Sequence, residues 1–180
     1  MAQLIMNWQN DGTPVKEITL PEGVEVINFP NLKNALSIWA DIIPYLNADG
    51  NMEKPEEYYQ HSMAENPNYN DNNCFFLLVN NCPAATLTVI CDYKKKQGYI
   101  HNVACKPEFR GKGFGNILNS IAVNVLKNQY MEGAYLTTDD WRIPAIKSYL
   151  RAGFAPDTVS DPSFKERWEK IYQIMTKHCL

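Results

Sequence analysis

The sequence predicts one α/β domain, an α/β sandwich in which antiparallel hairpins lead into a strand–loop–helix–strand unit. Three β-favourable runs follow one another at residues 74–79, 84–90 and 98–105, with short connections between them. A glycine-rich basic segment, 109–116, comes next and opens into apolar residues at helical spacing. A further short apolar run, 133–138, follows that helix. This order is typical of a mixed sheet with flanking helices.

Composition limits the class of protein. The 180 residues, 45% hydrophobic and 21% charged, are enough for one domain (1–180) with a full core. The net charge of −3 argues against nucleic acid and anionic membranes as partners. No segment approaches the roughly 18 apolar residues that span a bilayer, and the N-terminal MAQLIMNWQNDG lacks the features of a secretory signal. We therefore expect a cytoplasmic protein.

The cysteines and histidines show no metal-binding pattern. The five cysteines are odd in number and contain no CxxC pair, and His61, His101 and His178 lie at no ligand spacing from them. We expect reduced thiols and no metal site. The cysteines are Cys74, Cys82, Cys91, Cys105 and Cys179.

Before the hairpins, the pattern is less regular. The stretch VKEITLPEGVEVINF (15–29) predicts two short strands around a Pro-Glu-Gly turn. Residues 31–47 repeat apolar side chains at helical spacing and predict an amphipathic helix, and 53–65 predict a second one. The Asn-rich 66–73 that follows reads as a loop, either a solvated connection or a roof over a substrate cleft.

After the hairpins, helices and a last strand follow in turn. The stripe beginning near Gly113 predicts a helix, and GAYLTT (133–138) a buried strand. Pro144 suits the first turn of a third helix, and Gly153 suits its C′ position. Asp161-Pro162 reads as the N-cap and first position of a C-terminal helix, within a tail of 161–180.

The glycines of 109–116 indicate an anion site. Glycines between a strand and a helix let anion oxygens approach free backbone amides at the positive end of the helix. Arg110 and Lys112 add charge beside Gly111, Gly113 and Gly115. The spacing fits neither GxxxxGK[ST] nor GxGxxG. The alternative is that the glycines serve only tight strand–helix packing.

Two motifs resemble the GCN5-related N-acetyltransferases. The stretch YIHNVACKPEFRGKGFGN resembles motif A of that family, whose Arg-x-x-Gly-x-Gly is matched by Arg110, Gly113 and Gly115. The stretch AIKSYLRAGF (145–154) resembles motif B, with Tyr149 five residues before Phe154. The resemblance covers roughly 74–155, and the first 70 residues only in element order.

The resemblance implies where acetyl-CoA binds. In the family, the cofactor lies in a V-shaped gap between two splayed parallel strands, here 99–105 and 133–138. Its pyrophosphate would rest on the amides of the loop, and its pantetheine arm would pair with strand backbone as an added strand. The loop residues are Arg110, Gly111, Lys112, Gly113, Phe114 and Gly115, and the strand residues are Val103, Ala104 and Cys105. Cys105 is not expected to be a nucleophile, because the family transfers the acetyl group directly.

The resemblance also implies two catalytic candidates. Tyr149 matches the family's general acid, which protonates the departing sulfur; its alternative is a core tyrosine. Where many members have a Glu or a bound water as base, this chain has His101 and Asn102 and no carboxylate. Strand alternation places Tyr99, His101, Val103 and Cys105 on one face and Asn102 on the other. His101 titrates in a suitable range and is the base candidate, or else a partly buried structural residue.

The chain also departs from the family. Arg142 stands where members often carry Asn, and it could reach a phosphate or pair with Asp139 or Asp140. The two aspartates read as a helix-capping pair rather than as catalytic groups. Many members end in a β-hairpin, whereas 162–178 reads as a helix whose apolar face packs on its own sheet or on a second copy.

The resulting prediction is an acetyl-CoA-dependent N-acetyltransferase that acts on a small-molecule or peptide amine, as a monomer or homodimer. The acceptor would be selected by 31–73 and the C-terminal tail. Two alternatives are a non-catalytic acyl-CoA-binding sensor or scaffold and an unrelated phosphate-binding protein.

Overall fold

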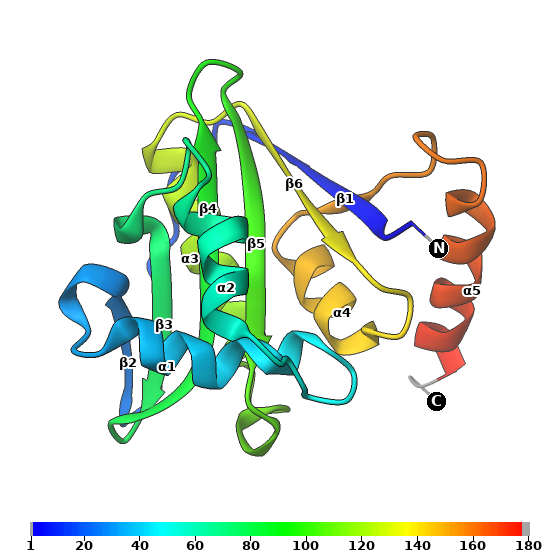
Figure 1. Ribbon diagram of the computed structural model, residues 1–180. Coiled ribbons are helices and arrows are strands. Elements are labelled where there is room, and N and C mark those ends of the chain that lie inside the picture. Colours follow the sequence, from blue (N-terminus) through cyan, green and yellow to red (C-terminus); the bar gives the residue numbers. More distant parts are fainter. Residues whose placement is uncertain (1, 178–180) are drawn as a thin grey trace.

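The computed structural model describes residues 2–177; Met1 and residues 178–180, which include Cys179 and the end of the expected tail, lie outside the described part. Within the described part, seven strands form one mixed sheet in the order β2-β3-β4-β5-β6-β1-β7 (Figure 1). The strands are β1 Leu4–Gln9, β2 Val24–Asn28, β3 Cys74–Val79, β4 Cys82–Asp92, β5 Gln97–Cys105, β6 Gly133–Thr138 and β7 Ala155–Pro156.

Helices cover both faces of the sheet and confirm the predicted fold class. They are α1 Ala35–Ile42, α2 Pro55–Tyr59, α3 Phe114–Asn128, α4 Ile143–Arg151 and α5 Phe164–Lys177. On one face, Trp39 of α1 and Met63, which lies in the turn after α2, are buried against the sheet. On the other face, α3, α4 and α5 contribute to the larger core with Leu118, Ile146 and Trp168. No helix within residues 2–177 is long and apolar enough to cross a membrane.

Strands β5 and β6 form the expected splayed parallel pair. They are paired from Gln97 opposite Gly133 to Ile100 opposite Leu136, and the pairing stops there. β5 continues to Cys105, still paired with β4, while β6 turns away from it (Figure 1). The open edge of β5 beyond Ile100 therefore faces a gap between the two strands.

A β-bulge interrupts β5 at the start of this gap. Thr86 pairs with Ala104 and Thr88 with His101, so that Asn102 and Val103 together oppose one residue of β4. Asn102 adopts φ +54°, a left-handed conformation that Asn tolerates better than most residues. The predicted alternation is therefore wrong beyond His101.

After the bulge, successive residues of β5 lie on different faces from those expected. Asn102 hydrogen-bonds to side chains beneath α2, as does Thr88, the cross-strand partner of His101. His101 and Asn102 thus share one face, and Val103 and Cys105 pack on the opposite one with the larger core.

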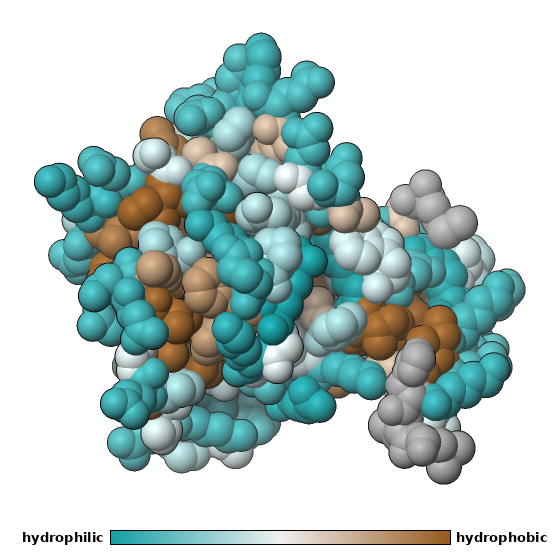
Figure 2. All heavy atoms as spheres, turned by 90° about the horizontal axis from the view of Figure 1, so that it is seen from below, coloured by the Kyte–Doolittle hydropathy of each residue, from teal (hydrophilic) through white to brown (hydrophobic). Residues whose placement is uncertain are grey.

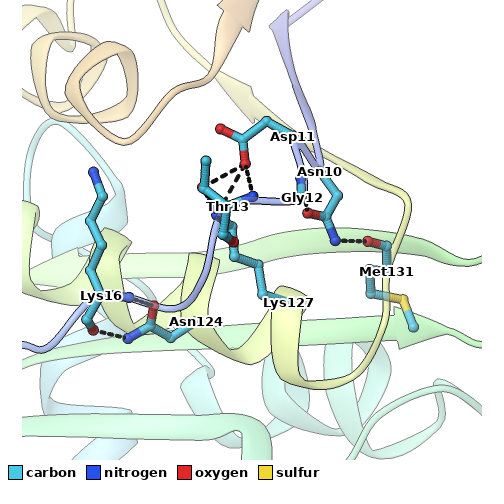
Figure 3. Close-up of polar contacts among 8 residues, drawn as sticks. All are labelled: Asn10, Asp11, Gly12, Thr13, Lys16, Asn124, Lys127 and Met131. Atoms are coloured by element: carbon cyan, nitrogen blue, oxygen red, sulfur yellow. Dashed lines mark hydrogen bonds and ion pairs between the residues drawn. The ribbon is translucent and has the colours of Figure 1, made fainter.

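The N-terminal segment holds the largest departure from the predicted order. β1, which the sequence did not suggest, lies between β6 and β7 and is antiparallel to both. Residues 15–20 are not a strand: β1 is followed by a segment that crosses α3, and Asn124 of α3 binds the Lys16 N–H at 3.1 Å and carbonyl at 2.7 Å (Figure 3). A side chain thus satisfies the backbone groups that a neighbouring strand would have paired.

Lys127 of α3 fixes the same segment. Its ammonium donates to Thr13 Oγ1 at 2.6 Å, to the Thr13 carbonyl at 2.9 Å and to Asp11 Oδ1 at 3.2 Å (Figure 3). Asn10 adds a bond to the Met131 carbonyl at 3.1 Å. We call residues 10–16 the N-terminal strap. It ties the first strand to the outer surface of α3.

The first two predicted helices are shorter than expected. α1 ends at Ile42 and continues as a 3₁₀ turn, Ile43–Leu46, because Pro44 lacks the N–H that an α-helix would use. α2 gives way to a π-helical turn at Gln60–Ala64.

The hairpin between β3 and β4 turns on Asn80 and Asn81, both at positive φ, as a two-residue turn requires.

The last two helices confirm the prediction with one shift. Pro144 lies in the first turn of α4, and Gly153 follows it at φ +91°, its N–H bonded to the Leu150 carbonyl at 3.1 Å. α5 begins at Phe164 rather than Pro162, and Asp161 accepts the Ser163 N–H at 2.8 Å in the turn before it. Its apolar face is buried against its own chain, with Trp168 1% exposed.

Candidate active site

The loop between β5 and α3 presents a row of free amides. Gly113 is the N-cap of α3 at φ +83°, and Gly111 lies at φ +75°. None of the N–H groups of residues 111–115 donates a hydrogen bond to the described part of the chain. A Cβ added at Gly111 or Gly113 would meet nothing within 4 Å. The row ends at the positive end of a 15-residue helix, where an anion is favoured.

Gly115 lies nearer to a neighbouring helix than the other two loop glycines. A Cβ there would lie 3.4 Å from Ser148 Oγ on α4, which is an ordinary van der Waals contact. Ser148 in turn accepts a 2.9 Å hydrogen bond from Asn119 of α3. The packing of α3 on α4 therefore does not require glycine at 115, and its amide belongs to the free row.

The basic side chains of the loop have partners of their own. Arg110 Nε donates to the Cys105 carbonyl at 3.1 Å, and Nη2 lies 3.5 Å from the Tyr45 carbonyl. Lys112 Nζ lies 5.2 Å from the centre of the Phe109 ring. Figure 2 shows the end of the molecule from which the loop projects, where hydrophilic side chains cover most of the centre of the face. Arg110 and Lys112 therefore place positive charge near the row of amides, while their own polar groups contact other residues of the chain.

Cys105 lies at the end of the open edge of β5. Its sulfur is 3.5 Å from the Lys106 carbonyl, and burial raises the pKa of the thiol above its usual value. A thiol held in its protonated form is a poor nucleophile.

Tyr149 of α4 is buried, with 6% of its surface exposed. Burial raises the pKa of its hydroxyl to about 12, while Arg142 lowers it and Tyr99 raises it by smaller amounts. Its ring makes an edge contact with Phe154, with centroids 6.3 Å apart. No hydrogen bond within residues 2–177 contributes to the pKa of this hydroxyl.

These features match the Acetyltransferase (GNAT) family, whose sequence model aligns with residues 39–154. The chain belongs to the GNAT family. Membership implies acyl transfer from acetyl-CoA. No curated protein has a significantly similar sequence.

Solved structures of GNAT proteins share the fold at low identity. A GCN5-related N-acetyltransferase from Sphaerobacter thermophilus superposes with a TM-score of 0.65 at 18% identity, over 87% of this chain and 50% of that one. An acetyltransferase from Streptococcus agalactiae gives 0.62 at 18%, over 78% and 88%. The ribosomal-protein-S18-alanine N-acetyltransferase from Escherichia coli gives 0.59 at 17%, over 73% and 77%. The chain thus spans about half of the Sphaerobacter protein.

His101 directly follows Ile100, the last residue of β5 that pairs with β6, and so lies where the gap between the two strands begins. Its Nε2 is buried without a hydrogen-bond partner in the described part of the chain, and its ring lies 4.8 Å from that of Tyr99. Burial lowers the pKa of His101 from 6.5 to about 4. The imidazole is therefore neutral at pH 7, with a free ring nitrogen and no carboxylate partner to raise its basicity.

Arg142 and the neighbouring aspartates act as ion pairs. Arg142 Nε lies 3.0 Å from Asp139 Oδ2, and its Nη2 donates to the Leu46 carbonyl. Asp140 pairs with Arg167 of α5, whose Nε donates to Asp140 Oδ2 at 3.0 Å. Neither aspartate caps α4, whose N-cap is Arg142 without a side-chain cap bond, so the predicted capping pair is wrong.

Sequence reasoning missed the aromatic side chains around the gap. Tyr99 and Tyr135 face each other across the parallel pair, and Tyr58 of α2 binds the bulge residue Asn102. Their signal in the sequence was weak, because it depends on a strand register that no local pattern reveals. The Asn-rich loop borders a surface groove with Pro30 and Tyr93, and none of the expected site residues lines that groove.

Proposed function

We propose that this GNAT domain transfers an acetyl group from acetyl-CoA directly to an amine, with both substrates bound together. The row of free amides at residues 111–115, beside the gap between β5 and β6, is the observation that carries this proposal. It supplies several hydrogen-bond donors in one place. A pyrophosphate has enough oxygens to accept from all of them, whereas a single phosphate would leave some of the donors unused.

The chain's own residues fit the cofactor. The amides of residues 111–115 would hold the pyrophosphate, and the open space over Gly111 and Gly113 leaves room for its oxygens. The Arg110 N–H, which the sequence analysis included, instead donates to the Pro107 carbonyl at 3.1 Å. The backbone of Val103, Ala104 and Cys105 would pair with the pantetheine arm along the edge of β5 that β6 has left. When bound, acetyl-CoA supplies a thioester whose carbonyl carbon accepts the amine and whose sulfur departs.

Tyr149 would stabilise charge on the departing sulfur. Full proton transfer from a group of pKa about 12 to a thiolate of pKa about 8.5 is uphill by about 5 kcal/mol. A hydrogen bond from the neutral hydroxyl to the developing negative charge does not carry this cost. We therefore assign Tyr149 a role as hydrogen-bond donor, with any proton transfer late.

His101 would receive the proton that leaves the amine. Its free Nε2 lies on the face of β5 that α2 covers, at the point where the gap opens. Because its pKa is about 4, His101 is a weak base that can relay a proton but cannot strip one from a strongly basic ammonium group.

Calorimetric titration with acetyl-CoA, CoA and ADP tests the proposal. Gly113→Glu places a carboxylate in the amide row, and Gly12→Glu is a matched control, because Gly12 also lies at positive φ with open space around it. We expect tight binding of acetyl-CoA by the wild type and by Gly12→Glu, lost in Gly113→Glu. Equal binding by both variants would contradict the assigned cradle.

Turnover then separates an enzyme from a binder. Release of free CoA thiol is followed with a diverse amine panel. Amine-dependent release supports the transferase. A protein that CoA saturates and that turns over no amine would be a non-catalytic acyl-CoA-binding module, which the weak basicity of His101 would explain. ADP binding as tight as that of CoA would indicate an unrelated phosphate-binding protein.

A further inference from the structure

Four side chains form an aromatic shelf at the mouth of the gap: Tyr58, Tyr99, His101 and Tyr135. The rings of Tyr99 and Tyr135 are stacked, with centroids 4.6 Å apart and planes 14° apart. On β5 itself, His101 follows Tyr99 by two residues, and the centroids of their rings lie 4.8 Å apart. The shelf stands where β5 and β6 are last paired, directly beside the gap.

One end of the shelf is open to solvent. Helices α1 and α2 lie over β2 to β5 on this face, and no helix within residues 2–177 lies over β6 and β1 there (Figure 1). Tyr135 of β6 accordingly remains 36% exposed. A flat ring that approaches from this side can extend the Tyr99–Tyr135 stack and still reach the gap.

Among residues 2–177, no carboxylate forms a hydrogen bond or an ion pair with a side chain of the shelf. Arg142, which lowers the pKa of Tyr149 against the larger effect of burial, is itself paired with Asp139 at 3.0 Å. Asp139 also accepts a hydrogen bond from Gln3 Nε2 at 3.2 Å. The shelf therefore offers no carboxylate to neutralise an ammonium group, and His101, with a pKa of about 4, is too weak a base to deprotonate a strongly basic one.

This setting discriminates among amines by basicity. At pH 7 an amine with a pKa near 10.4 is neutral in only about one molecule in 2,500, whereas a weakly basic amine is already neutral. Burial disfavours an ammonium group as it disfavours the charged form of His101, so a strongly basic amine must lose its proton to water before it binds, whereas a weakly basic amine binds as it is.

Given the proposed acetyl transfer, on which this step rests, we propose that the acceptor is a weakly basic aromatic amine. Its ring stacks on the free face of Tyr135, and its neutral nitrogen points into the gap, where β6 leaves β5 after Leu136. The N–C bond forms as the C–S bond breaks, and the sulfur keeps the electron pair. The proton on nitrogen passes to His101, as in the proposed transfer.

Four primary amines that differ in one property at a time test the proposal. Aniline is aromatic and weakly basic, benzylamine aromatic and strongly basic, cyclohexylamine neither aromatic nor weakly basic, and 2,2,2-trifluoroethylamine weakly basic without a ring. At pH 7 we expect kcat/KM for aniline to exceed that for each of the others by at least tenfold. A value for cyclohexylamine equal to or above that for aniline would overturn the inference.

A substitution on the shelf adds a second readout. Tyr135→Leu removes the outer ring, and we expect KM for aniline to rise roughly 3- to 10-fold, the range of one aromatic contact, with KM for trifluoroethylamine changed less than twofold. Tyr172→Leu is the matched control, an exposed tyrosine on α5 that should change neither. Equal effects of Tyr135→Leu on both amines would overturn the stacking.

The two proposals fail in different ways. Tight binding of acetyl-CoA with rapid turnover of cyclohexylamine but not aniline would retain the acetyltransferase and overturn only the acceptor class. Absence of acetyl-CoA binding by the folded wild type would overturn both.

Discussion

The Tyr58 hydroxyl donates a 2.9 Å hydrogen bond to Asn102 Oδ1 and so joins α2 to the bulge in β5. Asn102 also donates to the sulfur of Met63 at 3.2 Å, and its backbone lies at φ +54°. A left-handed residue inside a strand needs partners that hold it there. The bulge moves Val103 and Cys105 to the opposite face of β5. It therefore depends on α2, whose Tyr58 precedes Asn102 by 44 residues in the sequence.

Tyr58→Phe should destabilise the fold by about 1–2 kcal/mol, because it leaves a buried amide oxygen without its donor. Urea denaturation measures this loss. Tyr130→Phe, at a residue 83% exposed, is the control and should change the free energy of unfolding by less than about 0.5 kcal/mol. Equal stability of Tyr58→Phe and wild type would show that the bulge does not need this bond.

Tyr149→Phe should lower kcat by about a hundredfold, the usual cost of one donor to a developing charge. The KM for acetyl-CoA should change little, since the ring remains. The free energy of unfolding should stay within about 1 kcal/mol of wild type, because no partner in the described chain loses a bond. A kcat within threefold of wild type would instead make Tyr149 a core residue.

His101 should make the protein sensitive to acid. Its pKa is about 4 in the folded protein and 6.5 when unperturbed, so the unfolded chain binds more protons between these values. The resulting stability is fully present above pH 6.5 and falls as the pH approaches 4. Between pH 7 and 4.5, urea denaturation should show His101→Phe losing about 2–3 kcal/mol less than wild type. His61→Gln, at an exposed histidine, should follow wild type.

Trp168→Ala tests whether α5 is part of the domain. Trp168 is 1% exposed and its Nε1 donates to the Asp157 carbonyl at 2.9 Å, so its removal should cost about 3–5 kcal/mol. Tyr172→Ala, at a residue 44% exposed on the same helix, should cost less than about 1 kcal/mol. Similar small losses in both variants would mean that α5 is only loosely attached.

The parts of the fold that the sequence predicted are those with local signals. The strand β3 and the strand β6 were predicted with their observed bounds, because short apolar runs between turn residues mark them. The glycine loop and α4 were likewise evident, since Gly113 and Gly153 stand where helices begin and end.

The parts that were missed depend on distant partners. β1 alternates Leu4, Met6 and Trp8 toward the core, but the strand forms only because β6 and β7 flank it. The β-favourable 15–20 run bonds to Asn124 instead of to a strand, which its own residues do not reveal.

The same holds for the candidate site. The loop amides and Tyr149 were predicted by motif, whereas the aromatic shelf exists only in the register that sets Tyr99 opposite Tyr135. Of the partners considered for Arg142, Asp139 is confirmed, whereas its bond to the Leu46 carbonyl could not be predicted, because Leu46 comes from a distant element.

The position of β1 also determines the order of assembly during synthesis. Of the seven strands described, β1 is synthesised first yet waits longest for its neighbours, because its partners on both sides, β6 and β7, are the last two strands of the sheet to be made. Until they emerge, the apolar side chains of Leu4, Met6 and Trp8 have no surface to cover, and such exposed strands are prone to aggregate. Slow translation of the final third should therefore lower the yield of this protein more than slow translation of the middle.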